Sequence, residues 1–203
     1  MDDAAKITLS EAELDKVCDK EWILTKQRIT EKVYDLLGLH AAAVRQAFAA
    51  HGDFFGAEIT GSFPKISKGE NYLQMPYVML DYPSVFGRDH IFALRTMFWW
   101  GNFFSCTLLL KGHYADTFRE SIIHNLQKGS SGIYICIGHN EWDHHFEAGN
   151  YVPASEYNME ELGNRSFIKL AIKYDLEKWN EMRWLLEEGA MRLAGLMISP
   201  AVI

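Results

Sequence analysis

The sequence has few cysteines and no cysteine motif. Only three of its 203 residues are cysteine, namely Cys18, Cys106 and Cys136. An odd number of widely spaced cysteines provides neither a disulfide framework nor the C-x-x-C pair of zinc ribbons and redox enzymes. Because free cysteine is among the most buried residue types, we expect three reduced thiols in the core.

Runs of positive charge are also missing. The chain carries 20 Lys and Arg against 27 Asp and Glu, a net charge of −7, and its basic residues form no cluster. Since phosphate neutralisation needs a concentrated basic surface, this composition argues against a nucleic-acid partner. The N-terminus, MDDAAKITLSEAELDK, is acidic where a secretory signal would be basic, and no apolar stretch follows it. We therefore expect a cytoplasmic protein.

One segment approaches the length of a membrane span. Residues 91–110 carry a single charge, Arg95, but Gly101-Asn102 interrupts the apolar run. The aromatic and β-branched residues favour strands, and a Gly-Asn centre is typical of a two-residue hairpin turn. We expect strands at 92–100 and 103–111 and no membrane partner, with one long strand bulged at the glycine as the alternative.

Two helices are predicted near the N-terminus. Ser10 followed by Glu13 is a capping-box pattern, and apolar residues then recur at helical spacing. The pattern predicts a helix over 11–37 that ends at Gly38, followed by a shorter helix over 40–50.

The rest of the chain predicts an α+β fold. Strands that follow one another without crossover helices favour an antiparallel sheet, here of about four to six strands. We expect a single domain, residues 1–203, with long N-terminal and C-terminal helices packed on one face and residues 1–9 as a flexible tail. Residues 53–74 predict a long loop, with one short strand inside it as an alternative. The other predicted elements are a strand over 72–82 demoted toward an edge by Pro76, a helix over 113–128, strands over 132–138 and 166–176 with Lys169 and Lys173 facing water, and a final helix over 177–198.

The stretch GIYICIGHNEWDHHFEAGN, residues 132–150, concentrates histidines and acids. Imidazole and carboxylate suit a divalent metal such as zinc, so His139, Asp143 and His145 are candidate ligands, with Glu141 as a candidate catalytic base. The H-E-x-x-H pattern is absent, however, and spacing does not choose between strand and helix geometry. The alternative is a solvated loop after a buried strand.

Two histidines elsewhere could complete such a site. His90 and His113 flank the predicted hairpin, and either could converge on His139 if the strands are neighbours. No sequence pattern shows that they do.

Aromatic residues form 13% of the chain and gather in YLQMPYVMLDYPSVF and MFWWGNFF. Core packing is their simplest role, but on a sheet face without helices they would line a small-molecule cavity or make a dimer interface. A buried Arg95 would need a carboxylate partner, with Asp81 and Glu70 as candidates. The candidate ligand-binding residues are Lys68, Asn71, Tyr72, Tyr77, Arg95, Trp99 and Trp100.

The sequence thus supports three hypotheses about function. The first is a binding or interaction domain for an apolar or aromatic small ligand or for a protein partner, as a monomer or as a homodimer. The second is a metal-dependent hydrolase that uses the His/acid cluster at 139–147. The third is a structural subunit with no small-molecule site.

Overall fold

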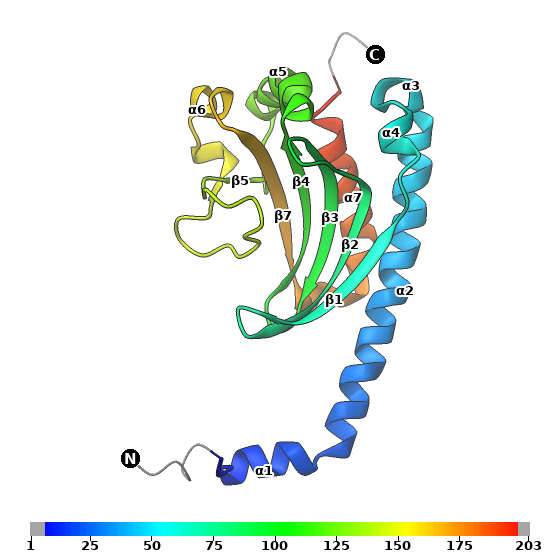
Figure 1. Ribbon diagram of the computed structural model, residues 1–203, viewed down its shortest axis with the longest axis vertical. Coiled ribbons are helices and arrows are strands. Elements are labelled where there is room, and N and C mark those ends of the chain that lie inside the picture. The colour runs from blue at the N-terminus through cyan, green and yellow to red at the C-terminus, as the bar shows by residue number, and fades with distance from the viewer. Residues whose placement is uncertain (1–6, 199–203) are drawn as a thin grey trace.

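The computed structural model describes residues 7–198 and shows a single α+β domain built on a seven-stranded antiparallel sheet (Figure 1). The spatial order is β1-β2-β3-β4-β7-β5-β6. The predicted fold class is confirmed, with one strand more than expected. The strands are β1 (Lys65–Tyr72), β2 (Met75–Phe86), β3 (Ile91–Trp99), β4 (Phe103–Lys111), β5 (Tyr134–Cys136), β6 (Tyr151–Pro153) and β7 (Phe167–Asp175).

Helices cover one face of this sheet. The helices are α1 (Glu11–Cys18), α2 (Lys20–Ala50), α3 (Gly52–Phe55), α4 (Ala57–Thr60), α5 (His113–Lys128), α6 (Met159–Gly163) and α7 (Met182–Gly195), with 3₁₀ turns η2 (Ala154–Glu156) and η3 (Leu176–Glu181). Helices α2, α5 and α7 contact the sheet and enclose the main core with it (Figure 1). The C-terminal helix buries the face that the sequence predicts, including Met182, Leu186 and Leu193.

The N-terminal helices divide at a different place from the predicted one. The chain breaks at Asp19, whose carboxylate accepts the N–H of Trp22 at 2.9 Å and caps a new helix. Gly38 lies inside α2 and does not end it. A glycine costs a helix about 1 kcal/mol, and the buried stripe that continues on both sides of Gly38 outweighs that cost. The stripe consists of Val33, Leu37, Ala41, Val44 and Phe48.

The predicted hairpin is confirmed. β3 and β4 pair antiparallel in register from Ile91 opposite Lys111 to Trp99 opposite Phe103, so the apolar run at 91–110 is two buried strands. Within residues 7–198, no helix is long and apolar enough to cross a membrane. The hairpin resolves as two strands because Gly101 adopts a φ of 69° in the turn.

Two predictions for residues 53–82 are wrong. The segment expected to be a long loop, with one short strand as an alternative, forms α3, α4 and the eight-residue edge strand β1. β2 is an interior strand, paired with β1 on one side and β3 on the other, because Pro76 stands near its beginning and leaves the ladder beyond it intact.

Of the tail expected at residues 1–9, residues 7–9 form no helix or strand and residues 1–6 lie outside the described part.

The thiol predictions hold for two of three residues. Cys106 and Cys136 are buried in the two apolar layers of the sheet. Cys18 is exposed, because α1 lies apart from the body of the molecule and none of its residues is buried (Figure 1).

The contact between α7 and β7 leads to a stability prediction. A Cβ at Gly189 would lie 2.1 Å from the Tyr174 hydroxyl oxygen, whereas a Cβ at Gly38 would meet nothing within 4 Å. We expect Gly189→Ala to lower the free energy of unfolding by about 2 kcal/mol through overpacking. Gly38→Ala should raise it by up to about 1 kcal/mol through helix propensity.

Urea unfolding of both variants measures these changes. The Tyr174 hydroxyl is buried without a hydrogen-bond partner in the described chain, so removing it costs no bond. Tyr174→Phe should therefore restore most of the stability lost in Gly189→Ala. If the double variant were no more stable than Gly189→Ala alone, the steric explanation would fail.

Candidate functional site

The second face of the sheet is covered by a loop. β5 and β6 pair with each other, so residues 137–150 leave and re-enter the sheet at neighbouring points (Figure 1). Phe146 anchors this loop, because its ring stacks on Tyr151 at 4.4 Å between centroids and meets Phe103 and Tyr134 edge-on at 5.1 Å. The His/acid stretch is therefore a packed cover over apolar strands.

Lys169 of β7 holds this loop from beneath. Its side chain is almost fully buried, at 1% exposure, and its ammonium donates hydrogen bonds to the backbone carbonyls of Glu141, at 2.9 Å, and Asp143. Lys173, four residues further along β7 and on the same face, is exposed as predicted. The prediction that Lys169 also faces water is wrong, because the loop covers that part of the face.

Arg95 and Asp81 form a second buried contact under the loop. The guanidinium donates Nε to Oδ1 at 2.6 Å and Nη2 to Oδ2 at 3.0 Å, which selects Asp81 from the two predicted partners. Nη1 lies 2.9 Å from Nε2 of His144. Burial, reinforced by the charges of Lys169 and Arg95, holds the pKa of His144 well below its usual range, so the neutral ring accepts this hydrogen bond.

Hydrogen bonds from three other residues satisfy the backbone of the loop. The Tyr72 hydroxyl accepts the N–H groups of His144 at 2.6 Å and His145 at 3.1 Å. Asn150 donates to the carbonyls of Asp143 and His145, and Arg165 donates to those of Ile137 and Gly138. These bonds hold an irregular segment in one conformation, since buried backbone groups need partners.

The structure does not arrange the candidate metal ligands as a set. His139 is exposed, a carboxylate oxygen of Asp143 accepts from Asn140 at 2.9 Å, and Nδ1 of His145 lies 3.9 Å from Glu147. Across residues 7–198, no three His, Cys, Asp or Glu side chains are placed to hold a metal ion. His90 and His113 do meet, with ring centroids 4.9 Å apart, but no third ligand joins them in that range.

The candidate base Glu141 is engaged elsewhere. Its carboxylate forms an ion pair with Lys111, and the hydrogen bond from that ammonium lowers the pKa of Glu141. A carboxylate with a lowered pKa is a weaker base than an ordinary glutamate, so this environment is the opposite of one that tunes a general base toward neutral pH.

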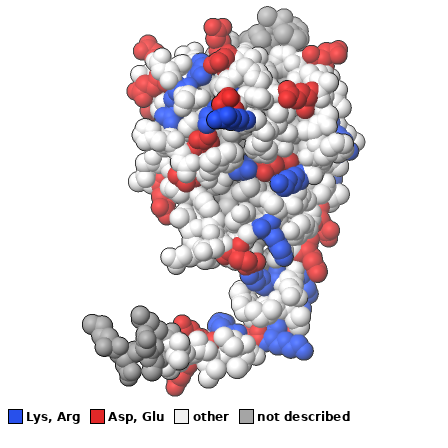
Figure 2. All heavy atoms as spheres, viewed as in Figure 1, with Lys and Arg blue, Asp and Glu red and all other residues white. Residues whose placement is uncertain are grey.

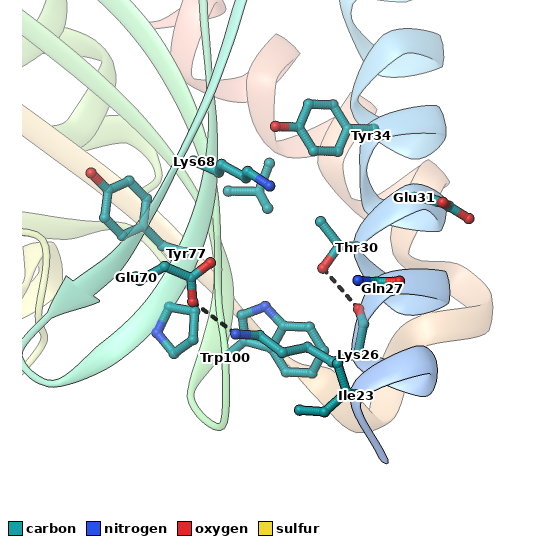
Figure 3. Close-up of a pocket in the computed structure, with 12 residues that line it drawn as sticks. Ile23, Lys26, Gln27, Thr30, Glu31, Tyr34, Lys68, Glu70, Tyr77 and Trp100 are labelled. Carbon is teal, nitrogen blue, oxygen red and sulfur yellow. Dashed lines mark hydrogen bonds and ion pairs between the residues drawn. The ribbon is translucent and has the colours of Figure 1, made fainter. Parts of the chain in front are cut away.

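A groove of about 460 Å³ lies on the helix side, where α2 passes the edge of the sheet formed by β1 and β2 (Figure 3). Trp100, the residue after β3, forms one wall, and Phe98 holds its ring at 5.2 Å between centroids. The groove is lined by Ile23, Lys26, Gln27, Thr30, Glu31, Tyr34, Lys68, Glu70, Pro76, Tyr77, Val78 and Trp100.

The charges around the groove are unequally paired. Lys26 and Glu70 form an ion pair at 2.7 Å that ties α2 to β1 across one end. Lys68 extends into the space between α2 and the sheet, while Glu31 turns to the outer side of the helix (Figure 3). Lys68 forms no ion pair with any residue in the range 7–198, so its ammonium is available to an anion.

The seven candidate ligand-binding residues are divided between the two faces. Lys68 and Trp100 line the groove, whereas Tyr77 borders it but turns its ring to the opposite face, 6.2 Å from the ring of Tyr72 between centroids. Tyr72, Arg95 and Trp99 belong to the opposite face, where Trp99 donates its indole N–H to the Tyr72 carbonyl and Tyr72 and Arg95 contact the loop. Asn71 stands exposed beside the β1–β2 turn, where its side chain accepts the N–H of Gln74.

Sequence reasoning missed the half of the groove that α2 supplies. Ile23, Lys26, Thr30 and Tyr34 precede β1 by more than thirty residues and carry no motif. Their helical spacing shows that they share a side of α2, but only the packing shows that β1 and Trp100 face that side. Comparisons with protein-family models, with curated proteins and with solved structures found no match.

The buried ammonium under the loop predicts a pH dependence. Burial lowers the pKa of Lys169 to about 8, while an unfolded lysine titrates near 10.4. Between these values the unfolded chain binds more protons, so the contribution of Lys169 to the free energy of unfolding rises with pH, by about 3 kcal/mol over the window. Relative to Lys169→Met, the wild type should therefore gain stability from pH 8 to pH 10.

Urea unfolding at a series of pH values measures this gain. Lys173→Met is the matched control, because that exposed lysine lies on the same strand and face. The free energy of unfolding of this control should change with pH in the same way as that of the wild type. A wild-type curve parallel to that of Lys169→Met would show that the buried ammonium is not linked to folding.

The Tyr72 hydroxyl predicts a local effect on the loop. Tyr72→Phe would leave the N–H groups of His144 and His145 without their acceptor, and an unsatisfied buried donor costs about 1–3 kcal/mol. We expect those two amides to exchange with solvent at least fivefold faster. Tyr77→Phe is the control, since the Tyr77 hydroxyl makes no hydrogen bond within residues 7–198; equal protection in both variants would refute the anchoring role.

Proposed function

We propose that this protein binds a small aromatic molecule that carries an anionic group, and that the groove between α2 and β1–β2 is the binding site. The observation that most supports this is the pairing of an aromatic wall, Trp100, with the ammonium of Lys68, which no carboxylate of the described chain neutralises. A volume of about 460 Å³ falls within the range of small-molecule sites.

The groove is prepared for such a ligand before it binds. Phe98 packs against the Trp100 ring from the core side, and the Lys26–Glu70 pair links helix and strand at one end of the groove. Preformed walls reduce the entropy lost on binding, so modest contacts can yield measurable affinity. In this arrangement the aromatic ring of the ligand lies along Trp100 and its anionic group meets Lys68.

Calorimetric titration with two matched probes tests the proposal. The probes are 2-naphthalenesulfonate, which is anionic, and 2-naphthalenemethanol, which is neutral. Lys68→Ala should weaken the sulfonate about fivefold, because a solvent-accessible ion pair contributes up to about 1 kcal/mol, and should leave the alcohol unchanged. Trp100→Ala should weaken both probes tenfold or more through lost aromatic contact.

Trp184→Ala is the control for the aromatic substitution. Trp184 is 64% exposed on α7 and does not line this groove, so its loss should change neither affinity. The proposal is wrong if the wild type binds neither probe at millimolar concentration. It is also wrong if Lys68→Ala weakens the charged and the neutral probe equally.

A further inference from the structure

The first part of the described chain forms an arm that leaves the body of the molecule. The arm, residues 7–32, comprises α1 and the beginning of α2, and Figure 1 shows it extending below the sheet with α1 turned across the end of α2. None of its residues is buried, and the first buried residue of α2 is Val33. Residues 20–32 form about 20 Å of helix, and the part from Ile23 to Glu31 borders the groove beside β1.

Helix α1 has little to stabilise it within one copy. It is eight residues long, and isolated helices shorter than about 12–15 residues are marginal in water. Its capping box at Ser10 and Glu13 is complete, yet Leu14 and Val17 on its surface are 52% and 69% exposed. A helix that is well capped and apolar on one side, but buries nothing, is suited to a surface beyond this copy.

The core-facing stripe of α2 continues into the arm. Counting back from Val33 by four, three and four residues reaches Ile29, Lys26 and Trp22, which therefore share the side that packs on the sheet. Ile29 still touches the core, but Trp22 is 43% exposed beyond the end of the sheet. Ile23, next to it, is also exposed. The apolar stripe of α2 thus continues beyond the end of the sheet that covers it.

Charge is separated along the arm. Helix α1 contains three acids, Glu11, Glu13 and Asp15, and one base, Lys16. Residues 20–32 contain four bases, Lys20, Lys26, Arg28 and Lys32, and two acids, Glu21 and Glu31. Figure 2 shows basic side chains where α2 leaves the body, and both acidic and basic ones along α1, where the acids are in excess. Lys20 and Lys32 form no ion pair within residues 7–198, which leaves them available.

This separation makes the arm complementary to a second copy of itself. A two-fold axis brings the same patch of both copies together in opposite directions, so a surface with acids at one end and bases at the other matches itself. We propose that the arms of two copies pair antiparallel, with α1 of each copy along residues 20–32 of the other. The apolar contact is then made by Leu14 and Val17 against Trp22 and Ile23.

Sedimentation equilibrium across micromolar to millimolar protein tests this pairing. The wild type should reach a mass of twice 23.3 kDa. Leu14→Ser with Val17→Ser should weaken self-association at least tenfold, because it removes the apolar side of α1. The matched control is Phe63→Ser, since Phe63 is 82% exposed outside the arm and its loss should leave the dimer intact.

A charge exchange tests the direction of pairing. Glu11→Lys with Asp15→Lys gives one variant, and Lys20→Glu with Lys32→Glu gives the other. Each should be monomeric alone, because like charges then face each other across the two-fold axis. An equimolar mixture should form a heterodimer, because the reversed α1 of one variant then faces the reversed residues 20–32 of the other. Circular dichroism should show both variants folded, since no arm residue is buried.

Three results would overturn the proposal. They are a wild type that stays monomeric at millimolar concentration, a dimer that survives Leu14→Ser with Val17→Ser, and a charge-exchanged mixture that does not associate. Co-sedimentation of the monomer with phosphatidylserine vesicles would instead identify the arm as a membrane-surface helix. Leu14 and Val17 do not line the groove, so naphthalenesulfonate binding can be measured in their monomeric variant, where no partner arm lies against Ile23.

Discussion

The central constraint on this structure is a sheet that is apolar on both faces. β3 and β4 are buried along almost their whole length, so water must be excluded from two sides at once. Three helices cover one side with an aliphatic and aromatic core. On the other side the chain offers no helix among the described residues, and the loop at 137–150 takes that place.

A loop that covers a sheet needs hydrogen-bond partners for its backbone that a helix in the same place does not need. A helix satisfies its own backbone groups, whereas a loop needs partners from elsewhere for each group that it buries. Lys169, Arg165, Tyr72 and Asn150 supply those partners. This explains why a lysine is buried in the middle of a strand, and why the histidine-rich stretch holds the fold together without a metal-ligand arrangement. Its polar composition reflects how its backbone and side chains are held.

The groove and the arm both arise because α2 is longer than the sheet that it covers. Where the helix passes the edge strand β1, the polar strand leaves a gap that Lys68, Trp100 and the Lys26–Glu70 pair border. Beyond that point the apolar stripe of the helix runs on without a covering surface. The two proposals therefore concern overlapping stretches of the same helix, which share Ile23; one faces a small ligand and the other a second copy.

The sequence by itself determined the fold class, the helix at 113–128 and the buried stripe of α7, because each depends on local periodicity. For residues 92–111 it favoured a hairpin over one bulged strand, and for Arg95 it required a carboxylate partner but left Asp81 and Glu70 as alternatives, which the structure resolved. Only the tertiary structure decided that Lys169 is buried, that Gly38 lies inside a helix, and that Trp99 and Trp100 serve opposite faces. Those outcomes depend on which distant segment covers each surface. The periodicity of one segment shows which of its residues share a face, but it does not show which other segment packs against that face.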